Sequence, residues 1–266
     1  MSKPLTSDVE ESPAAARPVR VDSTLSKGLQ ILEALSKSPN GKGVSDLSRE
    51  LGLTKSNTFR LLQTLTTLGY VRNSASKLYS ASMKVWQVGQ AVVEHLDLPK
   101  IAAPQLQMLS RKTGEAVYLA VPDGLSIIYV EKIESMQPIR SFTPKGGSAP
   151  MHCVGTGKAL LAANYETLRP QIRDHLVKYT DKTITSIKQL DADMAATRAR
   201  GYAIDTGEFR ERILSFGAAI RLPNGEPVAA LGVSAPDVNL AAGRDEEIAA
   251  LVLQAAQEVS LSLQEV

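Results

Sequence analysis

A run of polar and basic side chains between Lys55 and Arg60 carries the groups that proteins use to bind nucleic acid. Hydroxyl groups and a helix N-terminus can hold phosphate oxygens, and asparagine and arginine can each form paired hydrogen bonds with a base edge. We therefore predict that this segment contacts DNA. The predicted contact residues are Thr54, Lys55, Ser56, Asn57, Thr58 and Arg60, with Arg72 and Lys77 further along the chain.

Two short helices and a tight turn are predicted to position these side chains. Leu47 and Leu51 stand four residues apart within residues 45–51, which predicts a short helix with one apolar stripe. Gly52 supplies the turn, and Thr54 is suited to cap a second helix through its hydroxyl. The apolar residues predicted to face the core from that second helix are Phe59, Leu61, Leu62, Leu65 and Leu68.

A strand and its return follow the second helix. Gly69 is predicted to end the helix, and Tyr70 and Val71 to begin a strand. Residues 72–77 are predicted to form the wing tip, and residues 78–79 the strand that returns from it. A further helix over residues 26–36 is predicted to pack behind the pair through Leu29, Leu32, Ala34 and Leu35. The pattern is that of a winged helix-turn-helix, and the alternative is a small helical hairpin with solvated polar residues on its surface.

Charge supports the DNA prediction locally. Residues 20–94 contain ten lysines and arginines against five acids, a balance of +5, whereas the whole chain carries +2. The remainder is therefore net −3. A basic module joined to a mildly acidic one indicates that one part binds phosphate and the other part has a different task.

The length and composition predict two domains in a cytoplasmic protein. The 266 residues are 43% hydrophobic, contain no run of eighteen apolar residues and begin with a segment that lacks the apolar centre of a signal peptide. Cys153 is the only cysteine, which excludes an internal disulfide and a zinc site made of cysteine pairs. Residues 1–22 read as a disordered tail, in which Arg17 and Arg20 form either a minor-groove arm or part of an inert segment.

A helix over residues 83–96 is predicted to connect the two domains. Its side chains are too apolar for solvent alone, so we expect the helix to bury one face against a partner copy or the next domain. The residues that make this face are Val85, Trp86, Val88, Val92 and Val93. The expected assembly is a homodimer at minimum.

Beyond Asp97 the sequence predicts a mixture of helices and strands. The runs 116–121 and 126–131 flank Pro122-Asp123-Gly124, a strong hairpin turn, and a second hairpin joins 216–221 to 228–234. Residues 139–143 read as a further strand. Helices are predicted over 98–113 with Pro104 near a helix start, and over 155–163, 167–177, 186–200 capped by Gly201, and 245–264. The hairpins predict an antiparallel sheet covered by helices, which is an α+β domain.

Catalysis and metal binding find no support in the sequence. Residues 155–158 superficially match a phosphate-binding loop, but His152 stands where the first glycine is required and Ala159 stands where magnesium needs a hydroxyl. Adjacent His152 and Cys153 would point to opposite faces of a strand, so they do not form a nucleophile with its base. His95 and His175 have no metal-binding partner nearby in sequence. We predict no catalytic residue, no metal, no cofactor and no membrane association.

Several segments together resemble the IclR family of bacterial transcriptional regulators. They are LSKGLQILEAL, LSRELGLTKSNTFRLLQTLTTLGYV, TGEAVYLAV, PMHCVGTGKALLA, TRARGYAID and PVAALGVSAP, in that order between residues 24 and 263. The resemblance implies a winged helix-turn-helix in residues 23–82, a linker helix in 83–97 and a GAF-like effector domain in 98–266. It also implies binding to double-stranded promoter DNA and to a small organic acid, by a homodimer or homotetramer. We expect a repressor; the alternatives are an activator and an architectural DNA binder without a ligand.

The resemblance also implies a set of effector-binding positions. They are Gly155 and Thr156 through their backbone, and Asp205, Ser215, Gly232 and Ser234. Three positions depart from the commonest family pattern. This chain has Ser215 where the family often has cysteine, Gly232 where it often has serine, and Ala219 where it often has proline. The change at Gly232 predicts space for a bulkier ligand than the smallest keto acids.

The residues at these positions suit an anion. Gly155-Thr156-Gly157 opens a helix, so free backbone N–H groups and the positive end of the helix dipole would face a carboxylate. Phe209, Arg210 and Arg212 are either ligand contacts or surface residues beside a loop. Asp205 either receives a ligand hydroxyl or caps a turn.

Overall fold

The structure is a computed structural model that describes residues 22–74, 76–94, 98–241 and 243–263, with the backbone alone for 90–94. The chain forms two compact units that part between Val92 and Val93. The predictions about the tail, including Arg17 and Arg20, concern residues outside the described ranges. No helix in those ranges combines the length and the apolar composition that a membrane crossing requires.

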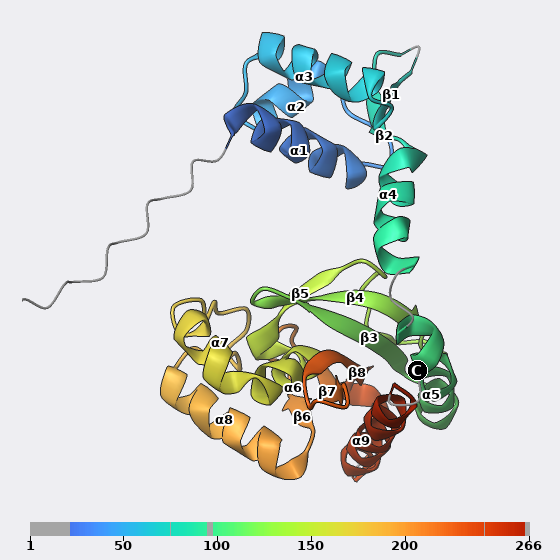
Figure 1. Cartoon of the computed structure of the whole chain (residues 1–266), viewed down its shortest axis with the longest axis vertical. Coiled ribbons are helices and arrows are strands. Elements are labelled where there is room, and N and C mark those ends of the chain that lie inside the picture. Colours follow the sequence, from blue (N-terminus) through green and yellow to red (C-terminus); the bar gives the residue numbers. More distant parts are fainter. Residues whose placement is uncertain (1–21, 75, 95–97, 242, 264–266) are drawn as a thin grey trace, which may run out of the picture. The chain divides into compact units, whose positions relative to one another are not determined.

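The first unit is a winged helix-turn-helix, as predicted (Figure 1). Its elements are α1 (Ser23–Ser36), α2 (Val44–Glu50), α3 (Lys55–Thr67), β1 (Val71–Asn73) and β2 (Tyr79–Ala81). Helix α4 (Met83–Glu94) follows and includes the boundary between the two units. Strands β1 and β2 pair antiparallel to form the wing. Lys42 and Tyr79 exchange two backbone hydrogen bonds of 2.9 Å, which ties the segment before α2 to the wing.

The core of this unit differs from the prediction at the ends of the helical stripes. The buried residues are Ile31, Ala34 and Leu35 of α1, Leu47 of α2, Leu61 and Leu62 of α3, and Val71 and Tyr79 of the wing. Phe59, Leu68 and Leu29 were predicted to be buried but are 45%, 53% and 50% exposed. A three-residue repeat drifts by about 60° per step on a helix of 3.6 residues per turn, so the ends of the stripe rotate toward solvent.

The second unit is an α+β domain built on one antiparallel sheet. The strands are β3 (Ala116–Asp123), β4 (Ser126–Ile133), β5 (Ser148–Pro150), β6 (Ala203–Asp205), β7 (Ile213–Arg221) and β8 (Pro227–Pro236). They lie in the order β5-β4-β3-β8-β7-β6. The helices are α5 (Leu98–Thr113), α6 (Gly155–Ala163), α7 (Tyr165–Ile172), α8 (Ile187–Arg200) and α9 (Arg244–Ser262), with short 3-10 turns η1 (Met151–Cys153) and η2 (Asp237–Asn239).

Helices cover both faces of this sheet (Figure 1). On β3, Val117 and Leu119 pack with α5 and α9, whereas Ala116, Tyr118 and Ala120 pack with α6, α7 and α8. Alternate residues of a strand point to opposite faces, so each strand serves two cores. The face covered by α6 also carries the cavity described below.

Three details of the second unit correct the sequence predictions. Residues 139–143 form no strand, because the backbone oxygens of Ile139 and Phe142 accept hydrogen bonds from the side chains of Asn239 and Arg210. Pro104 lies inside α5, whose start is at Leu98. Helix α7 spans Tyr165–Ile172 rather than residues 167–177.

Candidate functional site

The first turn of α3 presents polar side chains to solvent. Thr54 caps the helix, as predicted, with its hydroxyl accepting a hydrogen bond from the Asn57 N–H at 3.3 Å. Lys55, Ser56 and Arg60 are exposed, and Asn57 is partly exposed. The Arg60 guanidinium donates to the Asn57 side-chain oxygen at 3.4 Å. The structure therefore brings together two groups that can read base edges, one helical turn apart.

Thr58 cannot take part in a DNA contact. The residue is 0% exposed, and its hydroxyl donates to the Thr54 carbonyl oxygen at 3.0 Å. Thr58 lies three and four residues before the buried Leu61 and Leu62, so it belongs to the core stripe of α3. That spacing was present in the sequence, and it corrects the prediction from residue type alone.

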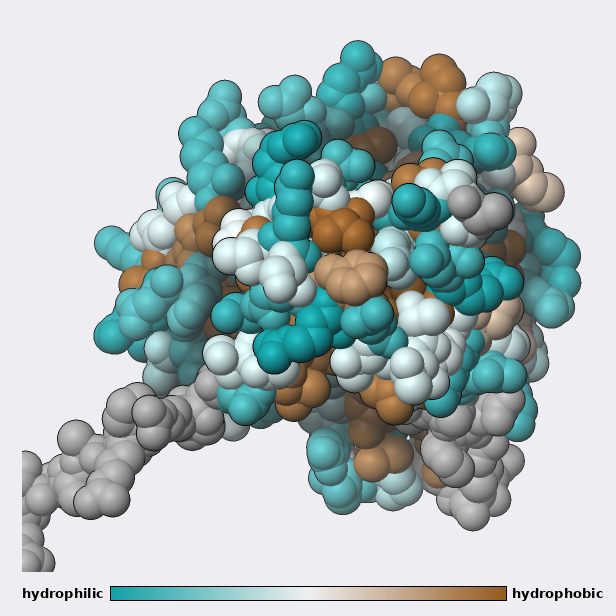
Figure 2. Space-filling model, turned by 90° about the horizontal axis from the view of Figure 1, so that it is seen from above, coloured by the Kyte–Doolittle hydropathy of each residue, from teal (hydrophilic) through white to brown (hydrophobic). Residues whose placement is uncertain are grey.

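The wing carries the other two predicted contact residues. Arg72 and Lys77 are both exposed. Lys77 has a φ of 61°, and its backbone N–H donates to the Ser74 carbonyl oxygen at 3.0 Å, which forms the tight turn of the wing. Hydrophilic side chains cover most of the face shown in Figure 2, with separate hydrophobic residues between them. The two exposed cations of the wing suit a polar, negatively charged partner.

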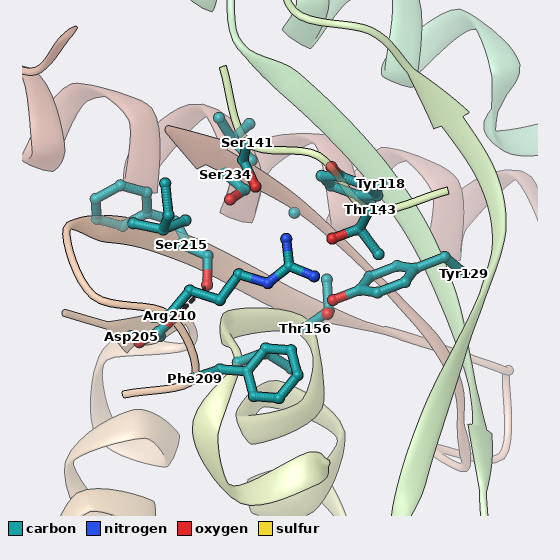
Figure 3. A pocket seen from close by; sticks show the side chains of 15 residues that line it. Tyr118, Tyr129, Ser141, Thr143, Thr156, Asp205, Phe209, Arg210, Ser215 and Ser234 are labelled. Atoms are coloured by element: carbon teal, nitrogen blue, oxygen red, sulfur yellow. Dashed lines mark hydrogen bonds between the residues drawn. The ribbon is translucent and has the colours of Figure 1, made fainter. Parts of the chain in front are cut away.

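The second unit contains a small cavity between the start of α6 and the sheet. All the predicted effector positions except Gly155 line it: Thr156, Asp205, Ser215, Gly232 and Ser234. Asp205 pairs with Ser215 across β6 and β7, and Ser215 pairs with Ser234 across β7 and β8. Strand register therefore places these three side chains in one row across the sheet (Figure 3).

A chain of hydrogen bonds links this row to α6. The Gly155 N–H donates to the Ser215 hydroxyl at 2.9 Å, and that hydroxyl donates to Asp205 Oδ2 at 2.8 Å. Asp205 Oδ1 accepts from the N–H groups of Gly207 and Glu208 at 2.9 and 2.6 Å. Asp205 thus caps a turn, and the Gly155 N–H, predicted to be free for an anion, already has a partner. Burial raises the pKa of Asp205, and these donors oppose the rise.

Gly232 does not leave space for a bulkier ligand. A Cβ at this position would lie 2.8 Å from the Thr156 methyl carbon and closer still to the Phe216 carbonyl oxygen. The backbone of β7 and the Thr156 side chain of α6 therefore occupy the space that a larger residue 232 would need. This corrects the expectation from the family pattern. Gly217, the cross-strand partner of Gly232, has the same role against the Gly155 backbone.

Aromatic and hydroxyl groups that were not predicted complete the cavity. They are Tyr118, Tyr129, Ser141, Thr143 and Phe216, and of the residues left open Phe209 and Arg210 also line it. The Tyr118 and Tyr129 rings pack with centroids 4.8 Å apart. Burial raises the pKa of Tyr129, against a hydrogen bond to Thr156 that lowers it. Arg212 lies outside the cavity and pairs with Asp237, with 3.1 Å between Nε and Oδ2.

A buried polar cluster around Lys158 fixes the loop that carries Phe209 and Arg210. Lys158 of α6 is 1% exposed; its ammonium group lies 2.5 Å from Glu208 Oε1 and 2.9 Å from Asp193 Oδ2, and it donates to the Ile204 carbonyl oxygen at 2.7 Å. Burial raises the pKa of Glu208 to about 7, although Lys158 opposes the rise. The loop is therefore attached directly to the helix at the floor of the cavity.

Two family models match the chain: the IclR helix-turn-helix domain over residues 24–75, and the bacterial transcriptional regulator IclR C-terminal domain over residues 90–261. The chain belongs to the IclR family. Its helix-turn-helix domain implies DNA binding, and the resemblance seen in the sequence is confirmed.

Curated IclR-family relatives extend over most of the chain. The transcriptional repressor IclR of Escherichia coli K12 is 33% identical over 244 residues, which cover 90% of this chain and 89% of the relative. The acetate operon repressor of Salmonella typhimurium has the same identity and coverage. The regulator KdgR of E. coli K12 is 32% identical over 251 residues, which cover 93% of this chain and 94% of KdgR. All three are transcriptional regulators by name.

Solved IclR-family structures share the fold. The IclR of Thermotoga maritima superposes with a TM-score of 0.74 at 28% identity, covering 90% of this chain and 98% of its own. An IclR homolog from Microbacterium hydrocarbonoxydans, solved in complex with 4-hydroxybenzoate, has a TM-score of 0.79 at 20% identity. The match covers 92% of this chain and 100% of the homolog. At that identity the second likeness concerns the fold alone.

Proposed function

We propose that this IclR-family regulator is a repressor whose first unit binds promoter DNA and whose second unit senses a small organic acid. The exposed polar first turn of α3, beside a wing with two exposed basic residues, carries the DNA part of the proposal. The proposed contacts are Thr54, Lys55, Ser56, Asn57, Arg60, Arg72 and Lys77. The relatives named as repressors support the sign of regulation.

The proposed division of labour follows the predicted boundaries, with residues 23–82 for DNA, 83–97 as a linker and 98–266 for the effector. The cavity supports effector binding, because it combines apolar walls with a few converging polar groups, as small-molecule sites do. The proposed lining comprises Thr156, Asp205, Ser215, Gly232 and Ser234, with Gly155 holding Ser215 in place.

Fluorescence anisotropy on a labelled fragment from upstream of the protein's own gene tests the DNA part. If Arg60 reads a base edge, Arg60→Ala costs about 1–3 kcal/mol, a loss of roughly five- to 150-fold on this fragment, with little change on random DNA. Arg173→Ala is the matched control, since it removes an exposed cation from the second unit. Equal affinity of parent and Arg60→Ala on both DNAs would contradict the assignment.

Reporter transcription tests the sign of regulation. A repressor predicts that deletion of the gene raises transcription from the bound promoter, and that Arg60→Ala does the same in the intact cell. Loss of transcription in both strains would instead identify an activator.

A further inference from the structure

One aromatic side chain of α3 lies outside the buried stripe of that helix. The stripe consists of Thr58, Leu61 and Leu62. Phe59 is 45% exposed, and the core of the first unit is made of other residues. A single exposed apolar side chain is ordinary on a protein surface, so its meaning depends on the side chains around it.

The neighbours of Phe59 on this face of α3 are polar groups that suit DNA. At about 100° per residue, four side chains fall within about 100° of the helix surface, on the side away from the buried stripe. They are Ser56, Phe59, Arg60 and Gln63, and all four are exposed. Ser56 and Arg60 are proposed DNA contacts. If they reach the major groove, the Phe59 ring reaches the base edges with them.

A groove between α3 and the wing borders the same ring. The side chains that line it are Phe59, Gln63, Thr66, Thr67, Asn73 and Tyr79. This lining contains amide and hydroxyl groups and no charged side chain, whereas a DNA phosphate gains most of its binding energy from cations. The surroundings of Phe59 therefore favour a neutral part of the duplex over its phosphate backbone.

Thymine offers the neutral group that fits a phenyl ring. In the major groove it presents a C5 methyl group, and phenylalanine is one of the side chains that pack on this methyl. The other base edges present hydrogen-bond donors and acceptors at the corresponding place. A phenyl ring would remove water from those groups without replacing the lost hydrogen bonds. The ring thus favours thymine and disfavours the other bases.

We propose that Phe59 determines sequence specificity by packing on the C5 methyl of one thymine in the site bound by each recognition helix. This inference rests on the proposed DNA binding of the first unit and specifies one base of the promoter site. Phe59 then contributes to specificity without a hydrogen bond, beside Arg60, which reads a base edge through its guanidinium.

Uracil interference on the promoter fragment tests the contact, because replacing thymine by uracil removes the C5 methyl and keeps the base pair. In the parent, replacement of one thymine under each recognition helix should weaken binding about fourfold, the effect of one buried methyl group. Anisotropy on fragments with thymine or uracil at that position then gives the ratio of affinities. The ratio should fall to about one in Phe59→Ala, because the partner of the methyl is gone.

Two further variants make the result specific to Phe59. Leu68→Ala is the matched control, since Leu68 is 53% exposed and caps the far end of α3. It should keep the fourfold ratio. Phe59→Gln keeps a long side chain that favours helix and should lose the ratio as Phe59→Ala does. Partial unfolding of a variant affects both fragments equally, so the ratio reports on the folded protein.

Three results would overturn the assignment of Phe59: no thymine whose methyl matters to the parent, a fourfold ratio retained in Phe59→Ala and Phe59→Gln, or a ratio lost in Leu68→Ala. Failure of the proposed function looks different. A parent that binds the promoter fragment no more tightly than random DNA removes the proposed function itself. A parent that prefers its promoter but tolerates uracil at every position keeps that function and loses only the methyl contact.

Discussion

Ser56 and Thr58 both carry hydroxyl groups at the start of α3, and the structure separates their roles. Ser56 is exposed, whereas Thr58 is buried with its hydroxyl on the Thr54 carbonyl oxygen. We expect Thr58→Val, which keeps the shape and removes that bond, to lower the free energy of unfolding of the first unit by about 1 kcal/mol. Promoter affinity of the folded variant should not change. Urea unfolding and anisotropy measure the two quantities.

Ser56→Ala is the companion variant for that measurement. Its hydroxyl faces solvent, so we expect stability within about 0.5 kcal/mol of the parent. Promoter affinity should fall. If Thr58→Val instead weakens promoter binding and leaves stability unchanged, Thr58 would be a DNA contact and not a core residue.

Glu208 makes stability depend on pH in a definite direction. Burial raises its pKa in the folded state from an ordinary value of 4.5 to about 7, so the folded protein holds a proton that the unfolded chain releases between these values. Its contribution to stability is therefore complete below pH 4.5 and is lost as the pH rises through about 7. The facing charged groups are Lys158, Asp193 and Asp205.

Glu208→Gln isolates this contribution. Between pH 5 and 7.5 the melting temperature of the parent should fall relative to that of the variant, because the neutral amide cannot titrate. Paired melting curves at half-unit pH steps give the difference directly. Parallel curves for the two proteins would show that Glu208 is ionised throughout the range.

At the scale of elements, local signals predicted most of the fold. The Thr54 cap placed the start of α3, and Pro122-Asp123-Gly124 placed the hairpin of β3 and β4. Residues 139–143 were predicted as a strand from the local sequence, but a strand also needs a ladder partner. Here the Arg210 and Asn239 side chains take the backbone oxygens instead. Contacts so distant in sequence leave no local pattern.

The cavity was predictable only in part for the same reason. Family resemblance supplied Asp205, Ser215 and Ser234, and strand register joined them into one row. Tyr118 had a usable signal, because it alternates with Ala116 and Ala120 on the face toward α6. Its register with Gly232 across β3 and β8 was not visible in the sequence. The close packing that fills the space at Gly232 could not be predicted without three-dimensional contacts.

That close packing leads to a prediction about α6. A Cβ on Gly217 would overlap the Gly155 backbone, so Gly217→Ala should lower the free energy of unfolding of the second unit by about 1–3 kcal/mol. Gly28→Ala in α1 is the control, since nothing lies within 4 Å of its Cβ position. It should raise stability by about 0.5–1 kcal/mol. Calorimetry on both variants measures the shifts, and tolerance of Gly217→Ala would show that α6 can move away from β7.

At the scale of the whole molecule, the two units differ in charge and in task. The winged helix-turn-helix lies in the segment with a net charge of +5, which favours phosphate, whereas the rest of the chain is net negative. Regulation requires that ligand binding and DNA binding be coupled by the same free energy in both directions. One recognition helix reads only a few base pairs, so a specific promoter contact calls for two of them related by symmetry.

Helix α4 offers a surface for that symmetry. Met83, Trp86 and Val88 are 61%, 59% and 49% exposed, and Val85 is partly buried; the predicted contributions of Val92 and Val93 lie outside the described side chains. Exposed apolar residues gathered on one short helix commonly mark an interface. We therefore expect a homodimer at micromolar concentration, paired in part through α4.

Trp86→Glu tests this expectation, because a charge at the centre of an apolar interface is costly to bury. Sedimentation equilibrium should show at least a tenfold weaker dimer, and promoter affinity should fall with it, since each half of a palindrome would then be bound separately. Gln87→Glu, which adds the same charge at the exposed neighbouring residue, should leave both quantities near those of the parent. A parent that sediments as a monomer while binding its promoter tightly would rule out the dimer.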